Sequence, residues 1–204
     1  MRGVGPAIAR GAAPAAFIGS PFEQAAAAAV ENAPYLKRLI ERRADLLTGV
    51  DADWPERMLR EALQAAEDIA AAPPGMDEGM RLLRRAKDAV HLATALADLS
   101  RSWPLARVTG ALTAFADASL RAALAMGARE RADRGHLSAA SSGDARGPVA
   151  GFALIAMGKM GAGELNYSSD IDFSVFFDPD SFPAPDPRAA AVRLVAPIAR
   201  VMEE

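Results

Sequence analysis

Cysteine is absent from this sequence, and histidine occurs only twice, at His91 and His136. Without a thiolate the chain can form no disulfide, no cysteine nucleophile and no cysteine-ligated zinc, and two histidines are too few for a polyhistidine metal site. No apolar run approaches the roughly 20 residues needed to span a bilayer. The sequence therefore excludes thiol chemistry and predicts no membrane segment.

An excess of positive charge is also missing. The 204 residues include 23 Lys and Arg against 26 Asp and Glu, which gives a net charge of −3. A protein that binds DNA or RNA along its backbone needs a basic surface, so we expect no nucleic-acid partner. The hydrophobic content of 51% is ordinary for a globular chain and suffices to bury a core.

The amino terminus has a faint likeness to a targeting peptide, because Arg2 and Arg10 precede the first acidic residue, Glu23. Glycine and proline nevertheless interrupt every apolar stretch in this part of the chain, unlike the continuous apolar core of a signal peptide. We therefore predict a disordered tail over residues 1–20 and a cytoplasmic protein.

Residues 21–134 have the pattern of a helical bundle. Ser20 and Glu23 have the spacing of a capping box, and the proline at position 34 predicts a break in the first helix. Apolar residues then recur at helical spacing, with two long helices predicted over 77–99 and 104–131. We expect four or five packed helices.

The composition changes after this bundle. Serine, glycine and proline predict a linker over residues 135–148. The following run, 149–157, is continuously apolar and bounded by turn residues, which is typical of a strand buried on both faces.

A second strand is predicted at 171–177 and a final helix at 188–204, with a kink or broken turn at Pro197. Two strands and one helix are too little for a stable α/β domain. Residues 149–204 are therefore expected to be part of a second domain.

Two carboxylates, Asp170 and Asp172, stand at the predicted start of the second strand. Residues two apart on a strand point to the same face, so both side chains are expected to converge. Paired carboxylates repel each other unless a cation lies between them, and such oxygen ligands suit Mg²⁺ shared with phosphates and water. An isolated Asp-x-Asp is more often a loop cap or a solvated edge, so the residues before it decide its interpretation.

Those residues form a glycine- and serine-rich turn over 158–169, directly after a predicted strand. Backbone N–H groups of such a turn can bind phosphates. The turn matches neither a dinucleotide-binding fingerprint nor a Walker A loop. A strand, a glycine-rich turn and paired acids in this order favour metal-assisted phosphoryl or nucleotidyl transfer.

Residues 157–173, MGKMGAGELNYSSDIDF, closely resemble the nucleotidyltransferase signature of the glutamine synthetase adenylyltransferase/adenylyl-removing family. The likeness extends upstream through helical segments such as 82–99 and 108–117 and covers about residues 20–204. It implies an α+β fold, in which an N-terminal all-α helical bundle precedes the start of a polymerase-β-like nucleotidyltransferase domain.

The resemblance also implies an activity and partners. A signature that follows about 150 mostly helical residues resembles the adenylyl-removing half of the family. Its reaction is phosphorolysis, in which inorganic phosphate attacks the AMP–tyrosine phosphodiester of glutamine synthetase and yields ADP. The second half of the family adds AMP from ATP to the same tyrosine. The implied partners are glutamine synthetase and, for the full-length family, the PII signal protein.

Roles for individual residues follow from the same resemblance. Asp170 and Asp172 are expected to be catalytic and to bind Mg²⁺, in a two-metal site. The nucleotide (ATP, ADP or AMP) and its phosphates are expected at the residues of the turn, namely Gly158, Lys159, Gly161, Gly163, Ser168 and Ser169. Lys159 could equally be a solvated loop residue. Glu164 and Asn166 also match the signature, but their role could be limited to holding the loop together.

This sequence departs from the family pattern in one respect, because the third catalytic carboxylate of the family lies on a strand beyond Glu204. We therefore expect an amino-terminal fragment. Two alternatives remain open: a catalytically incomplete helical interaction module for glutamine synthetase, and a nucleotidyltransferase for another hydroxyl acceptor.

Overall fold

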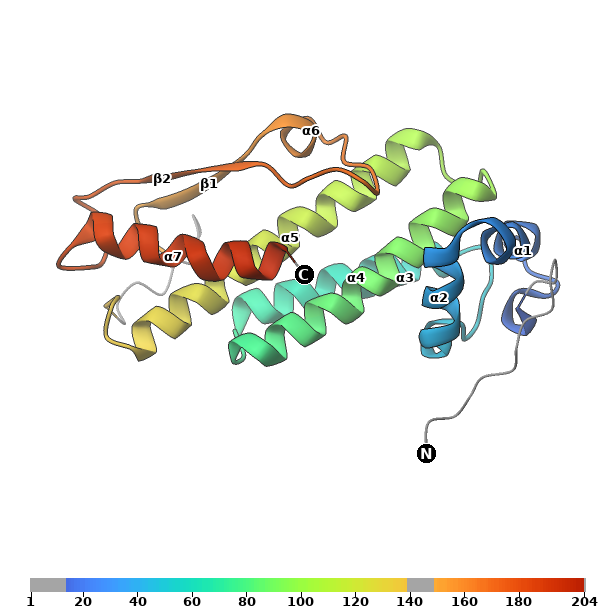
Figure 1. Ribbon diagram of the computed structural model, residues 1–204, viewed down its shortest axis with the longest axis horizontal. Helices are drawn as coiled ribbons and strands as arrows, with labels where there is room; N and C mark the ends of the chain where they lie inside the picture. Colours follow the sequence, from blue (N-terminus) through green and yellow to red (C-terminus); the bar gives the residue numbers. More distant parts are fainter. Residues whose placement is uncertain (1–13, 139–148, 204) are drawn as a thin grey trace.

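The computed structural model describes residues 14–138 and 149–203. Three long helices lie side by side, α3 (Trp54–Ala71), α4 (Met76–Leu99) and α5 (Leu105–Asp133), and the two short helices α1 (Glu23–Asn32) and α2 (Pro34–Arg42) lie at one end of them (Figure 1). Two 3-10 turns flank the short helices, η1 (Ala15–Phe17) and η2 (Ala44–Leu46). The predicted bundle of helices is thus observed, and α4 and α5 begin and end within two residues of their expected bounds.

The break predicted between the first two helices is confirmed. Ala33 has φ −122° and ψ 91°, an extended conformation, and α2 begins at Pro34. A residue before proline is pushed out of the helical region by the proline ring, so the chain must turn there. The capping box expected at Ser20 and Glu23 does not form, because α1 begins only at Glu23 and Phe22 is its N-cap. Instead, Ser20 Oγ accepts from Phe22 N–H (3.2 Å), and Glu23 Oε2 accepts from Gly19 N–H (2.7 Å), in the turn before the helix.

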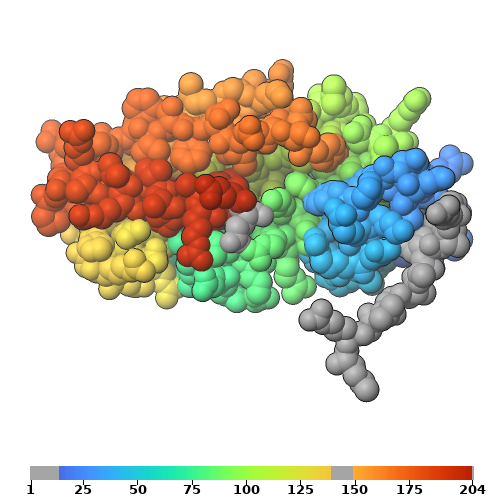
Figure 2. All heavy atoms as spheres, in the orientation of Figure 1, coloured from blue at the N-terminus to red at the C-terminus, as the bar shows by residue number. Residues whose placement is uncertain are grey.

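A strand pair and a helix cover one face of the bundle. Strands β1 (Phe152–Ala156) and β2 (Phe173–Phe177) pair antiparallel, with Ala156 opposite Phe173, and the short helix α6 (Gly158–Gly161) lies between them. Helix α7 (Pro187–Met202) packs beside them against α5. Figure 2 shows these carboxyl-terminal residues, in orange and red, as a continuous layer over the helices. The α+β class is confirmed.

The prediction that the first strand is buried on both faces was wrong. Burial alternates along β1, and the side chain of Ile155 is 48% exposed. Among the described residues, helices cover one face of this two-stranded sheet, so alternate residues of the strand remain open to solvent. The second strand begins at Phe173 rather than at residue 171, and α7 continues through Pro197 without the predicted broken turn.

One hydrophobic cluster joins the bundle to this layer. It contains buried residues of α3, α4, α5 and α7 together with Phe152, Met160 and Leu165 of the strand segment. A second cluster surrounds the fully buried Trp54, whose indole contacts Phe17 and Phe22. The segment that carries the signature, residues 157–173, therefore packs against the bundle.

The outer bounds predicted for the tail and the linker differ from the structure. Residues 1–13 and 139–148 lie outside the described ranges. Most of the predicted tail and linker therefore falls outside the described residues, and of the residues inside them Phe17 is fully buried and Leu137 is 5% exposed. None of the described helices combines the length and the apolarity that a membrane crossing requires.

Candidate functional site

The signature segment forms a closed loop between β1 and β2. The backbone N–H of Met157, which follows β1, donates to the carbonyl oxygen of Asp172, which precedes β2, over 2.8 Å. This bond extends the strand pairing by one step and brings the two ends of the segment together. Residues that are 15 positions apart in the sequence are thereby neighbours.

Gly158 and Asp172 lie next to each other at the closed end of this loop. Gly158 has φ +53°, and a Cβ placed on it would lie 3.4 Å from Asp172 Oδ2. A positive φ strains every residue with a side chain, and glycine avoids that strain. The first glycine of the predicted turn and the second acid of the pair therefore share one corner of the loop.

A close backbone approach explains a second glycine of the turn. A Cβ on Gly161 would lie 2.6 Å from the carbonyl oxygen of Ala156, closer than real Cβ contacts allow. Only a residue without a side chain lets α6 fold back onto the end of β1 in this way. Gly161 thus shapes the turn through its backbone rather than through a side chain that touches a ligand.

The Asn166 side chain organises the next turn. Its Oδ1 accepts hydrogen bonds from Ser168 N–H (3.0 Å) and from the Ser169 hydroxyl (2.9 Å), and the Asn166 N–H donates to Ser169 Oγ (3.1 Å). Asparagine commonly forms such local turns. The alternative that Asn166 holds the loop together is therefore observed, and Ser169 Oγ is engaged in the same network.

The loop is fixed to helix α5 at Leu165. The Leu165 side chain is 4% exposed within the main hydrophobic cluster, and its N–H donates to Thr113 Oγ1 over 3.3 Å. Thr113 in turn donates to the carbonyl oxygen of Thr109, one turn earlier in α5 (2.9 Å). This buried contact fixes the position of the loop relative to α5.

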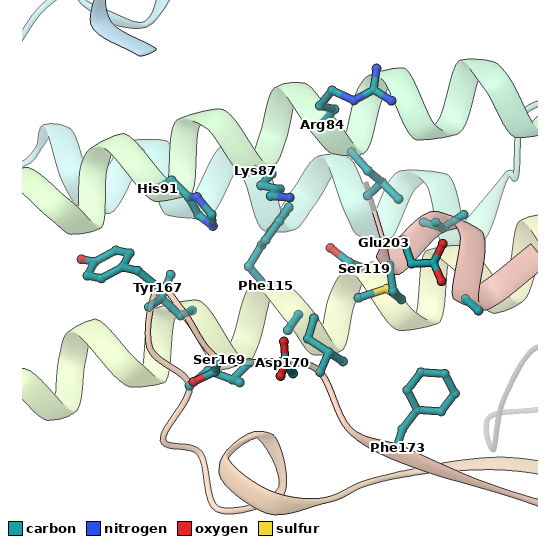
Figure 3. Close-up of a pocket in the computed structure, with 18 of the residues that line it drawn as sticks. Arg84, Lys87, His91, Phe115, Ser119, Tyr167, Ser169, Asp170, Phe173 and Glu203 are labelled. Atoms are coloured by element: carbon teal, nitrogen blue, oxygen red, sulfur yellow. The ribbon is translucent and has the colours of Figure 1, made fainter. Parts of the chain in front are cut away.

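A cavity of about 550 Å³ lies between the bundle, α7 and this loop. Figure 3 shows Lys87 extending from α4 toward Phe115 of α5, with Ser169 and Asp170 on the opposite wall. The floor is apolar and includes Leu83, Leu112, Ile171 and Phe173, and Glu203 closes the α7 side. The cavity thus combines an apolar interior with charged groups at its walls.

His91 closes one end of the cavity in a contact with two tyrosines. Its Nδ1 shares a 3.0 Å hydrogen bond with the Tyr35 hydroxyl, and Tyr167 of the loop packs edge-on to the ring. Burial, aided by the nearby charge of Lys87 and opposed by Asp88, lowers the pKa of His91 to about 4. Burial also raises the pKa of Tyr167. At neutral pH this end of the cavity is therefore uncharged.

The structure separates the predicted site residues into two groups. Ser169 and Asp170 line the cavity, while Gly158 and Asp172 meet at the closed end of the loop. The expected convergence of Asp170 and Asp172 rested on a strand over both residues, and β2 begins only after them. Gly163 (φ +75°) forms a turn, and the side chains of Lys159 and Ser168 are exposed.

The sequence did not identify the bundle residues that line this cavity. Arg84, Lys87 and His91 of α4 all line it, and none of them belongs to the signature. Their spacing of three and four residues on one helix was the available signal, since such positions share a face. These side chains line a cavity only because the loop packs opposite this face of α4. The loop lies more than 70 residues further along the sequence, so helix spacing alone does not reveal the contact.

The acids of the loop fit Mg²⁺ better than they fit a metal ion whose ligands all come from the protein. Mg²⁺ is commonly bound through one or two carboxylates, with substrate phosphates and water completing its sphere. In the part of the chain that the structure describes, no three His, Asp or Glu side chains come together as a metal site. Asp170 and Asp172 are both exposed and could serve as such a partial donor set.

A family model and several known proteins are similar to this chain over most of its length. The family model described as glutamate-ammonia ligase adenylyltransferase matches residues 23–202. Proteins named bifunctional glutamine synthetase adenylyltransferase/adenylyl-removing enzyme are 45% identical over 174 residues in Caulobacter vibrioides and 44% identical over 180 residues in Bradyrhizobium diazoefficiens. A third, from Rhodopseudomonas palustris, is 39% identical over 177 residues. These matches cover 84–85% of this chain but only 17–18% of each relative.

Proposed function

This chain belongs to the glutamate-ammonia ligase adenylyltransferase family, and from that premise we propose that it contributes a nucleotidyltransferase site that removes AMP from adenylylated glutamine synthetase. The names of the relatives support glutamine synthetase as the substrate protein. The mostly helical residues that precede the signature, as in the adenylyl-removing half of the family, support the adenylyl-removing direction. The polymerase-β-like fold and, in the full-length family, the PII partner are parts of the same proposal.

One observation carries the chemical part of the proposal: the loop brings the first glycine of the turn against the carboxylate of Asp172. A phosphate bound at the backbone of that turn would lie within reach of a cation held by the acid. Mg²⁺ bound there would neutralise charge that develops on the transferring phosphoryl group. Asp172, beside Gly158, is the residue that would hold it, and Asp170, two positions earlier in the loop, is proposed as its second ligand.

The proposed reaction is a displacement at phosphorus. An oxygen of inorganic phosphate forms a bond to the phosphorus of the AMP group, and the bond from that phosphorus to the tyrosine oxygen breaks. The tyrosine oxygen takes up a proton, so the products are ADP and unmodified tyrosine. The backbone of the turn would orient the phosphates, and the anchoring of Leu165 on Thr113 would keep the loop in position.

The test is phosphate-dependent release of ADP from adenylylated glutamine synthetase in the presence of Mg²⁺. We expect release by the native chain and its loss in Asp170→Asn and in Asp172→Asn. Asp180→Asn, which removes an exposed carboxylate from the loop after β2, is the matched control and should retain activity. Equal release by all four proteins would reject the roles of the two acids.

A second candidate function is a helical interaction module that binds glutamine synthetase without catalysis. The absence of a third acid beside Asp170 and Asp172 among the described residues favours it. It predicts binding of glutamine synthetase with no ADP release, and equal binding by Asp172→Asn. Release of nucleotide from a different adenylylated hydroxyl compound, but not from glutamine synthetase, would instead indicate another acceptor.

A further inference from the structure

A second concave site lies beside the first one and is lined by five arginines and two aspartates. Its volume is about 390 Å³, and we call it the arginine pocket. The lining residues come from the end of α2, from the residue that follows it, from η2 and from the first half of α4. They are Arg42, Arg43, Asp45, Arg81, Arg84, Arg85 and Asp88. Five guanidinium groups therefore face two carboxylates in a space of molecular size.

The centre of the arginine pocket is rigid. Arg43 donates to both oxygens of Asp45, each over 2.9 Å, and to Asp88 Oδ2 over 2.9 Å. Its side chain is only 11% exposed, and it also donates to the carbonyl oxygen of Arg85. Hydrogen bonding from Arg43 lowers the pKa of the Asp45 carboxyl. Arg43 and the two acids thus form a fixed structural core.

The rim of the pocket is different, because its arginines are exposed. Arg42 is 61% exposed and donates to Asp88 Oδ1 over 3.0 Å, whereas Arg85 is 58% exposed and reaches Asp45 Oδ2 only at 3.4 Å. A guanidinium has five N–H donors in a planar fork. In the hydrogen bonds between described residues each of these two arginines uses one, so both can still bind an oxyanion.

The same rim also has a surplus of positive charge. Two aspartates line the pocket beside five arginines, and Arg81 at its edge pairs with Glu78, which lies outside that lining. Guanidinium groups that converge without enough acids repel one another, and a bound anion relieves this repulsion. Phosphate suits them best, since its oxygens match the paired N–H groups of arginine.

Arg84 connects the arginine pocket to the first cavity. It contributes to the lining of both, on opposite sides of α4. Figure 3 shows its guanidinium turned away from Phe115 and Asp170, while Lys87 points toward them. An anion bound in the arginine pocket would therefore act on a helix that also forms a wall of the candidate catalytic site.

We propose that the arginine pocket is a binding site for a phosphate group, held by the exposed forks of Arg42 and Arg85 above the fixed Arg43 core. The phosphate is either free inorganic phosphate or the phosphate of a nucleotide. The site is separate from the one at Asp170 and Asp172 and requires no metal. Its occupancy does not depend on the proposed deadenylylation.

The test is a titration of the 204-residue chain with inorganic phosphate, followed through the NMR signals of the arginine Nε–H groups. A chelator and constant ionic strength remove metal-dependent binding and general screening. We expect saturable shifts of the Arg42 and Arg85 signals. The Arg42→Gln/Arg85→Gln protein should bind at least tenfold more weakly, and Asp170→Asn should bind as the native chain does.

The control variant is Arg60→Gln/Arg121→Gln, which removes the same charge from two exposed positions outside the pocket. It should bind phosphate as tightly as the native chain, and circular dichroism should show that both double variants are folded. Parallel titrations with AMP and ADP distinguish a free phosphate site from a nucleotide site. Linear, unsaturable shifts, equal binding by both double variants, or binding of an acidic peptide in place of phosphate would overturn the proposal.

Discussion

The ring of Tyr167 lies edge-on to the imidazole of His91, with centroids 6.4 Å apart and planes at 90°. Tyr167 belongs to the signature loop and His91 to α4, so this contact joins the candidate site to the bundle. On its other side His91 contacts Tyr35, at the start of α2. Three segments of the chain thus meet at one neutral imidazole.

This contact predicts a pH dependence of stability. The pKa of His91 is about 4 in the folded chain, below its ordinary value of 6.5, because the ring is buried and lies near Lys87. Between these two values the unfolded chain binds a proton that the folded chain does not, so stability falls as the pH is lowered through this window. The loss is at most about 3 kcal/mol and is complete below the folded pKa.

Denaturant unfolding of the native chain and of His91→Gln at pH 7, 5.5 and 4 measures this effect. The native chain should lose more stability than the variant over this range. His136→Gln, at an exposed position, is the control. Parallel pH profiles for the native chain and His91→Gln would contradict the burial argument.

Thr113→Val should loosen the signature loop. Valine has nearly the same shape as threonine but cannot accept the Leu165 N–H, which would remain buried without its partner. An unsatisfied buried N–H costs about 1–3 kcal/mol. Amide hydrogen exchange at Leu165 should accelerate.

The neighbouring Thr109→Val changes an exposed hydroxyl that donates to the carbonyl oxygen of Ala106 in its own helix, and it should shift stability by about 0.5 kcal/mol or less. Unchanged exchange at Leu165 in Thr113→Val would show that the 3.3 Å contact does not fix the loop.

Gly161→Ala should displace α6 from the end of β1. The added Cβ would meet the carbonyl oxygen of Ala156 at 2.6 Å, and a backbone atom cannot move aside as a flexible side chain can. We expect a loss of about 1–3 kcal/mol. Gly110→Ala is the matched control, because no atom of the described residues lies within 4 Å of its Cβ position.

In a helix interior alanine is favoured over glycine, so Gly110→Ala should stabilise the chain by up to about 1 kcal/mol. Thermal unfolding measures the stability of both variants relative to the native chain. A Gly161→Ala protein as stable as Gly110→Ala would contradict the close approach of α6 and β1.

Arg43→Gln should be strongly destabilising, whereas Arg134→Gln should not. Removing Arg43 leaves the largely buried carboxylate of Asp88 and its neighbour Asp45 without their main partner, at a cost of about 3 kcal/mol. Arg134 makes one exposed ion pair with Glu130, whose loss costs about 0.5 kcal/mol. Urea unfolding at pH 7 compares them, and equal midpoints would show that the Arg43 network is dispensable.

Local patterns in the sequence were sufficient for the helices and for the family signature. The proline at position 34 and the apolar periodicity of α3, α4 and α5 act within a few residues, so their consequences can be derived without knowing the fold. The signature is likewise contiguous. Its order of strand, glycine-rich turn and acids identifies residues 157–173 as a candidate site without any knowledge of how the chain packs.

Only the tertiary structure decided which side chains share a site. Lys87 and Asp170 line one cavity although they are far apart in the sequence, and Arg42 and Arg85 meet in another. Such meetings depend on how helices pack against each other and against a loop, and no local propensity encodes them. The open outer face of β1 has the same origin, because burial depends on which neighbours cover a strand and not on its own apolar residues.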